Sequence, residues 1–244
     1  MSAWAMKRFW TEARSEKTEE GWRVLLDDRP IRTPAKAPLI VPHAAFADAI
    51  AAEWDKQEEA IDPSVMPVTR SANAAIDKVR HQHAEVADML AAYGDSDLLC
   101  YRAETPADLV ARQAAIWDPY LDWAADALAA RLQPRTGIMH AAQDPATLAR
   151  LREKVHAMDA FGLAAFHDLV SLTGSLVLGF AATHGFAPEP VWAASRLDED
   201  YQAELWGEDE EAAEMAAHKR AAFLDAGRVW RLSRGQAADI DRPW

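Results

Sequence analysis

The sequence predicts an α+β fold, with a small N-terminal antiparallel sheet and helix followed by a larger all-helical domain. Half of the 244 residues are apolar, which is enough for a sizeable core. Aromatic and β-branched residues gather in 7–42, whereas alanine and helical spacing dominate the rest. A loop marked by prolines at 61–67 separates these patterns, so we place the domains at 1–65 and 66–244.

The first part of the chain favours strands and turns. Segments 7–14 and 21–28 carry aromatic and β-branched residues, and the run Asp27-Asp28-Arg29-Pro30 is typical of a turn. The run 38–42 is short, apolar and bounded by prolines, which is typical of a strand near a sheet edge. We therefore expect a small antiparallel sheet here.

Helical spacing begins at residue 43, where Phe46, Ile50 and Trp54 recur every four residues. This spacing predicts that Trp54 is mostly buried against the sheet or the domain junction. A short strand or connector is expected at 97–101. The remaining helices are predicted at about 68–93, from Pro106 with a kink or an interruption near Pro119, and at 144–158, 160–184, 188–206 and 209–232.

The composition argues against several classes of protein. A formal net charge of −13 disfavours nucleic acid and anionic membrane surfaces as partners. The most apolar run, 169–182, is too short to cross a bilayer, which takes ~20 residues, and is predicted to lie in a central buried helix. A single cysteine and the lack of a recognisable signal or transit peptide predict a cytosolic protein.

Motifs for catalysis or metal binding are missing from the sequence. It has no glycine-rich phosphate loop, nucleophile elbow, zinc-ligand spacing or complete calcium loop. Cys100 lies among Leu98, Leu99 and Tyr101, which predicts a buried, unreactive thiol. We expect no cofactor, no metal and no catalytic residue. An enzyme using helix-borne carboxylates and a generic acidic adaptor remain as alternatives.

The segment 188–206 carries aromatic residues on two faces of a predicted helix. One face, the expected core stripe, holds Ala194, Leu197, Tyr201 and Leu205. The opposite face holds Trp192, Arg196, Glu199, Ala203 and Trp206. Exposed aromatic and arginine side chains often dominate the energy of protein interfaces. This second face is therefore either a docking surface or a second buried face.

Four separated segments, 24–42, 51–77, 96–119 and 195–209, resemble the assembly chaperone family that binds the alpha subunit of F-type ATP synthase. The resemblance implies a non-enzymatic protein that holds the free alpha subunit until the beta subunit replaces it. It also implies an α/β N-terminal domain and a helical C-terminal domain. The mitochondrial members carry a presequence that this chain lacks, so we expect a bacterial cytoplasmic form. We also expect the protein to be monomeric when free.

The resemblance and the helical spacing together name two sets of residues. The predicted partner-binding residues are Trp192, Arg196, Glu199, Gln202, Trp206 and Gly207. The predicted structural residues are Glu53, Trp54, Asp97, Arg102, Trp117 and Asp118, with Asp97 and Arg102 expected as a structural pair that ties the connector to nearby helices.

Overall fold

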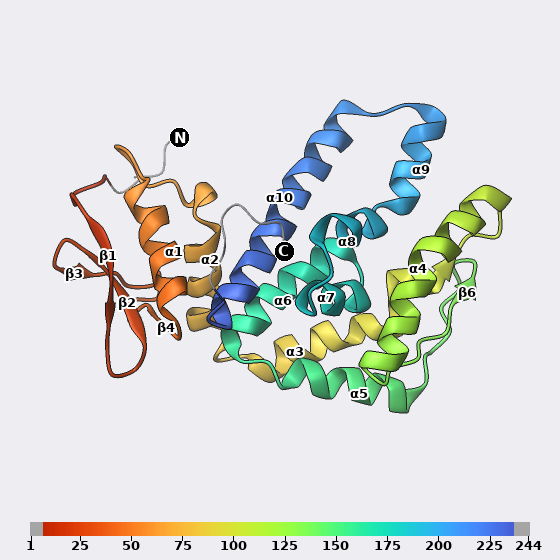
Figure 1. Cartoon of the computed structure of the whole chain (residues 1–244), viewed down its shortest axis with the longest axis horizontal. Coiled ribbons are helices and arrows are strands. Elements are labelled where there is room, and N and C mark those ends of the chain that lie inside the picture. The colour runs from red at the N-terminus through yellow and green to blue at the C-terminus, as the bar shows by residue number, and fades with distance from the viewer. Residues whose placement is uncertain (1–6, 237–244) are drawn as a thin grey trace. The chain divides into compact units, whose positions relative to one another are not determined.

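The computed structural model describes residues 7–236, and its contacts divide the chain into two compact units (Figure 1). Of the described residues, one unit holds 7–83, Asp159–Ala165 and 228–236; we call it the sheet unit. The other, the helical unit, holds Ala84–Met158 and Phe166–Gly227. The α+β fold class is confirmed. The domain boundary at residues 65 and 66 stays a prediction, since units defined by contacts need not be units that fold independently.

The sheet unit begins with four short antiparallel strands. They are β1 (Ala13–Lys17), β2 (Trp22–Leu26), β3 (Arg29–Pro30) and β4 (Ile40–Val41). Strand β2 is central: β1 pairs along one side of it, and β3 and β4 pair with its two ends on the other. The predicted turn at 27–30 is confirmed, because Leu26 faces Arg29 across a two-residue connection. Asp27 occupies the left-handed region there (φ 53°), which aspartate tolerates better than most residues.

Helix α1 (Ala44–Asp55) packs on β1 and β2 and supplies the core of this unit. The side chains of Phe46 and Ile50 are completely buried, as the four-residue spacing predicts. Trp54, the third member of the series, is only half-buried. Its ring meets Trp10 edge-on at a centroid distance of 5.4 Å. The spacing therefore predicts the face of the helix correctly, but Trp54 lies at the rim of the core.

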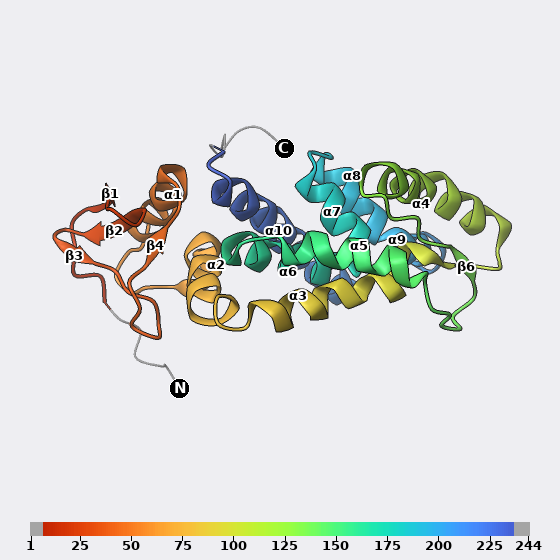
Figure 2. The same cartoon turned by 90° about the horizontal axis from the view of Figure 1, so that it is seen from below.

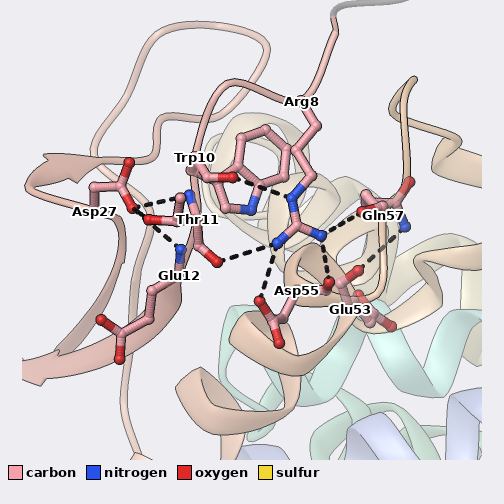
Figure 3. Close-up of polar contacts among 8 residues, drawn as sticks. All are labelled: Arg8, Trp10, Thr11, Glu12, Asp27, Glu53, Asp55 and Gln57. Atoms are coloured by element: carbon pink, nitrogen blue, oxygen red, sulfur yellow. Dashed lines mark hydrogen bonds and ion pairs between the residues drawn. The ribbon is translucent and has the colours of Figure 1, made fainter.

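Arg8 joins the segment before β1 to the end of α1 (Figure 3). Its Nη1 donates to the carbonyl oxygens of Asp55 at 2.7 Å and Gln57 at 2.5 Å. Its Nε donates to the carbonyl of Trp10 at 3.1 Å. A cation placed on the last carbonyls of a helix satisfies acceptors that have no partner within the helix and opposes the negative end of its dipole.

Glu53 connects α1 to the following helices of the sheet unit. These are η1 (Pro63–Val65), α2 (Pro67–Ala74) and the π-helical turn η2 (Ala75–Val79). One Glu53 oxygen accepts the backbone N–H of Val68 at 2.7 Å. The other accepts the N–H and the hydroxyl of Thr69, at 2.8 and 2.6 Å. Burial raises the pKa of this carboxyl, and the hydrogen bonds from Thr69 and Val68 oppose that rise.

The continuous helix predicted for 68–93 is wrong. The chain forms α2 and η2, turns at 80–82, and begins again as α3 (His83–Ala91). No glycine or proline marks this break. The apolar spacing continues from Ile76 through Val79 to Ala87, so the sequence has no local signal for it.

The helical unit contains most of the remaining elements. They are η3 (Ala92–Ser96), η4 (Leu98–Cys100), β5 (Tyr101–Arg102), α4 (Ala107–Ala127), β6 (Arg135–Thr136), α5 (Pro145–His156), α7 (Leu176–Thr183), α8 (Pro188–Ser195) and α9 (Leu197–Trp206). Helix α6 (Ala160–Thr173) begins in the sheet unit and ends in the helical unit, and α10 (Glu210–Ser233) does the reverse. Helices α3 and α5 run side by side (Figures 1 and 2), and Asp88 accepts a hydrogen bond from Arg152 at 2.7 Å.

Three further helix predictions differ from the structure. The segment 160–184 breaks at Gly174 (φ 69°) into α6 and α7, although α7 is buried as expected. Helix α4 runs through Pro119 without a break. Residues 115 and 119 are both exposed, so water can bond to the carbonyl that proline leaves without a donor. The segment 188–206 also breaks, as described below. Within residues 7–236, no helix combines the length and apolarity needed to span a membrane.

Glu53→Gln should destabilise the fold by ~1–3 kcal/mol, because the new amide group would turn an N–H toward a buried donor. Val68 or Thr69 would then lose its acceptor. Urea denaturation of both proteins measures the difference. Glu58→Gln, an exposed change nearby, is the control and should stay within ~0.5 kcal/mol. Equal stability of the Glu53 and Glu58 variants would contradict the capping role.

Candidate partner-binding surface

The single helix predicted for 188–206 breaks at Arg196, which has φ −105° and ψ 2°. The indole Nε1 of Trp117, on α4, donates to the carbonyl oxygen of Ala194 at 2.8 Å. In a continuous helix that carbonyl would accept the N–H of Asp198, four residues on. A side chain from a distant helix thus occupies the acceptor at the junction between α8 and α9.

Two side chains of this segment differ from the prediction in their exposure. Trp192, predicted on the exposed face, is 7% exposed, and its ring lies 5.7 Å from that of Phe223. The prediction that Trp192 lies on an open docking face is therefore wrong. Leu205, assigned to the core stripe, is instead 56% exposed. Leu197 and Tyr201 are buried as predicted. Leu205 shares a face with Leu197 and Tyr201 within α9, so its exposure comes from its place at the end of this helix and not from the break.

Polar contacts with α4 hold α9 in place. The Tyr201 hydroxyl donates to the Asp108 carboxylate, 3.0 and 2.9 Å from its two oxygens. The Gln113 amide donates to Asp198 at 2.7 Å. Arg112 forms an ion pair with Glu204 at 2.6 Å, and Glu204 raises the pKa of its guanidinium.

The outward side of α9 forms what we call the α9 surface: Glu199, Gln202, Leu205, Trp206 and Gly207. All five are exposed, and Trp206 is 80% exposed. Glu199 pairs with half-buried Arg196 at 2.8 Å, so this predicted binding residue lies at the edge of the surface. Figure 1 shows α9 leading into the turn before α10. The structure thus brings together Arg196, Glu199, Gln202, Trp206 and Gly207 on or beside one surface, without Trp192.

Acidic residues predominate around this surface, and Arg196 and Arg112 pair with two of them. Between residues 197 and 218 the sequence has no lysine or arginine. The same stretch has nine acidic residues: Asp198, Glu199, Asp200, Glu204, Glu208, Asp209, Glu210, Glu211 and Glu214. An apolar step of Leu205 and Trp206 therefore lies within a strongly negative rim.

The turn after α9 is specified locally. Gly207 has φ 93°, a conformation that favours glycine, and its N–H donates to the Ala203 carbonyl at 2.9 Å. Asp209 then accepts the N–H of Ala212 at 2.8 Å and begins α10. Met215, 55% exposed on α10, is an apolar residue near this turn that sequence reasoning missed.

Asp97 and Cys100 lie inside the helical unit. One Asp97 oxygen accepts the N–H of Leu99 at 3.0 Å and the hydroxyl of Ser175 at 2.7 Å. The other accepts the N–H of Val177 at 3.0 Å, so Asp97 ties η4 to the start of α7. Burial raises the pKa of Asp97 to about 6. The prediction that Cys100 is buried is confirmed by its exposure of 3%, and burial raises the pKa of its thiol to about 12.

Arg102 ties the same connector to α4. Its guanidinium forms an ion pair with Asp118 at 2.7 Å and lies over the ring of Trp117 at 5.2 Å. Its Nε also donates to the carbonyl of Leu99 at 2.8 Å. Asp97 and Arg102 therefore tie the connector to two nearby helices, α7 and α4.

The polar groups described here hold helices and connectors, and none forms a recognisable catalytic arrangement. Across residues 7–236, no group of three or more His, Cys, Asp or Glu side chains is placed to hold a metal ion.

Comparisons with known proteins define the class. A family model described as "ATP12 chaperone protein" matches residues 7–125. The crystal structure of Atp12 from Paracoccus denitrificans is 52% identical, covers 93% of this chain and 98% of its own, and gives a TM-score of 0.91. A solved structure from Agrobacterium tumefaciens is 43% identical, with 92% and 85% coverage and a TM-score of 0.89. The mitochondrial protein atp12 of Schizosaccharomyces pombe is 26% identical, over 86% of this chain and 77% of its own.

These matches and the fold define a chaperone, not an enzyme. The chain belongs to the ATP12 chaperone family, which confirms the predicted resemblance to a family of ATP synthase assembly chaperones.

Trp192 and Trp206 should respond very differently to truncation. Trp192→Ala removes a buried ring and should cost ~3–5 kcal/mol of stability. Trp206→Ala removes an exposed ring and should cost within ~0.5 kcal/mol. Urea denaturation of the two variants measures both costs, and similar values would show that the two rings are not buried to different extents.

Asp97→Asn should destabilise the protein by ~1–3 kcal/mol, because the new amide would face the N–H of Val177 or the donors on the other oxygen.

The pKa of Asp97 in the fold, about 6, lies above its usual 3.8. Its contribution to stability is therefore fully present below about pH 3.8 and is lost as the pH rises through about 6. The stability advantage of wild type over Asp97→Asn should shrink from pH 4 to pH 7. Chemical denaturation at several pH values tests this, and an advantage that grows with pH would contradict the raised pKa.

Proposed function

We propose that this protein binds the free alpha subunit of the F-type ATP synthase catalytic sector and covers its interface until the beta subunit replaces it. The observation that carries the proposal is the exposed Leu205–Trp206 step on the acidic α9 surface. Membership of the ATP12 chaperone family supports the proposal, because the sequence resembles the assembly chaperones that bind the alpha subunit.

The physical problem of subunit assembly matches this surface. A subunit waiting for its partner exposes apolar area, which invites aggregation. Trp206 supplies a large amphipathic side chain at the contact, and tryptophan is enriched among residues that dominate binding energy. An isolated apolar step is small compared with a permanent subunit interface, so the beta subunit can displace it.

The acidic rim sets the chemistry of the partner. Nine carboxylates around the step favour a partner surface with lysine or arginine beside an apolar patch. Such charges speed association, and their effect weakens as the salt concentration rises. The net charge of −13 also favours solubility of a complex that carries an aggregation-prone subunit.

Two variants test the surface against purified alpha subunit. Trp206→Ala should weaken binding at least ~30-fold, the loss expected of an interface hot spot. Glu199→Lys should weaken binding and reduce its dependence on salt, because it reverses a charge at the rim. Both variants should unfold within ~0.5 kcal/mol of wild type. Isothermal titration calorimetry and thermal unfolding give these values.

Matched controls separate binding from folding. Glu153→Lys makes the same charge change at an exposed site on α5 and should leave binding unchanged. Leu197→Ala should lose ~2–5 kcal/mol of stability as a core truncation. If Glu199→Lys unfolds like Leu197→Ala, Glu199 is structural. If wild type fails to bind the alpha subunit, the proposed function is wrong.

A further inference from the structure

Ile138 and Met139 are the most exposed large apolar side chains in the part of the chain that the structure describes. Their exposed fractions are 92% and 81%. They lie in the segment 128–144 of the helical unit, between α4 and α5. Single exposed apolar residues are common, but two adjacent ones at nearly full exposure are characteristic of a contact surface.

The backbone around this pair is held by several contacts. Strand β6, just before it, pairs in parallel with β5, and the N–H of Gly137 donates to the carbonyl of Arg102 at 2.8 Å. The buried Gln143 side chain bonds to both backbone groups of Gln133, at 2.8 and 3.0 Å. Asp95 accepts the N–H of Gln143 at 2.7 Å. The structure therefore presents Ile138 and Met139 on an ordered segment, which lowers the entropy that binding would cost.

An open groove of about 580 Å³ lies beside the pair, and Ile138 and Met139 line it together with Glu104, Gln113 and Asp198. Asp198 belongs to the first turn of α9, and Gln113 bonds it at 2.7 Å. The groove is thus continuous with the helix that carries the α9 surface. Figure 1 shows α4 and β6 at one end of the helical unit.

The charges in the groove indicate what it accepts. Glu104 is exposed, and the groove also contains the carboxylate of Asp198. The one arginine that lines it, Arg102, is already paired with Asp118 at 2.7 Å. An apolar side chain next to a lysine or arginine would fit this combination of apolar wall and negative charge.

We infer that the Ile138–Met139 pair and its groove form a second docking site for the same protein partner that the α9 surface binds. The site takes an apolar segment flanked by a cation. This inference rests on the proposed function, because it assigns the occupant to the same partner through Asp198, which lines the groove and lies at the start of the helix that carries the α9 surface. Two separated contacts on one partner would add affinity while each stays weak enough to release.

The first test measures affinity of the full chain for purified alpha subunit by calorimetry. The double variant Ile138→Ser/Met139→Ser should bind at least ~10-fold more weakly, and Met89→Ser, an exposed methionine on α3, should bind as wild type does. Glu104→Lys should also weaken binding, whereas Glu153→Lys should not. Thermal unfolding of all four variants should match wild type, since each changed side chain is exposed.

The second test asks whether the partner touches the site. Met139→Cys labelled with a photoreactive maleimide should crosslink to the alpha subunit, and Met89→Cys treated in the same way should not. Cys100 is 3% exposed, so the label should attach only to the introduced thiol. The crosslinked peptide of the alpha subunit, identified by mass spectrometry, should contain an apolar residue next to lysine or arginine.

The outcomes separate the two proposals. If Trp206→Ala weakens binding but the double variant binds normally and Met139→Cys fails to crosslink, the second site is wrong and the proposed function stands. If wild type does not bind the alpha subunit, both fail. If sedimentation shows a homodimer that the double variant abolishes, a second copy of this chain occupies the groove, and the inference is overturned.

Discussion

Three polar contacts between α4 and α9 are the constraint on which the candidate surface depends. Helix α9 buries only Leu197 and Tyr201, too little apolar area to fix a ten-residue helix by packing alone. The bond from Tyr201 to Asp108, the ion pair of Glu204 with Arg112 and the bond from Gln113 to Asp198 fix it instead. These contacts leave Leu205 and Trp206, at the end of α9, exposed. Gln113 also lines the groove beside Ile138 and Met139, so one set of contacts supports both proposed docking sites.

Buried carboxylates organise helix starts in both units. Glu53 accepts the first N–H groups of α2, and Asp97 accepts those at the starts of η4 and α7. Helix N-termini have N–H groups without internal partners and carry partial positive charge, which favours a carboxylate there. Desolvation still raises the pKa of both acids, so each is a compromise between burial and hydrogen bonding. These groups look like catalytic acids by pKa alone, but their oxygens are already used by backbone donors.

A chaperone of this kind needs an exposed apolar contact that does not cause its own aggregation. The structure combines the two requirements by surrounding Leu205 and Trp206 with acidic residues. Like charges keep copies of the chain apart, and the same charges attract a basic partner. Two small contact sites on one partner would together give a higher affinity than either site alone. Each site would stay small enough for the partner to dissociate.

The sequence by itself determined the α+β fold class, the sheet within 7–42, the starts of α4, α5 and α8 near residues 106, 144 and 188, and the burial of Cys100. Each depends on local chemistry: β-branched and aromatic composition, turn residues, or proline at a helix start. Tertiary structure alone decided the break at Arg196, where an indole on α4 bonds to a carbonyl that a continuous helix would use. The burial of Trp192 beside Phe223 and the exposure of Leu205 at the end of α9 are likewise tertiary effects. It also decided the contacts of Arg8 with Asp55 and of Asp97 with Ser175, which join residues 47 and 78 positions apart. Local patterns carry no information about partners that only folding brings together.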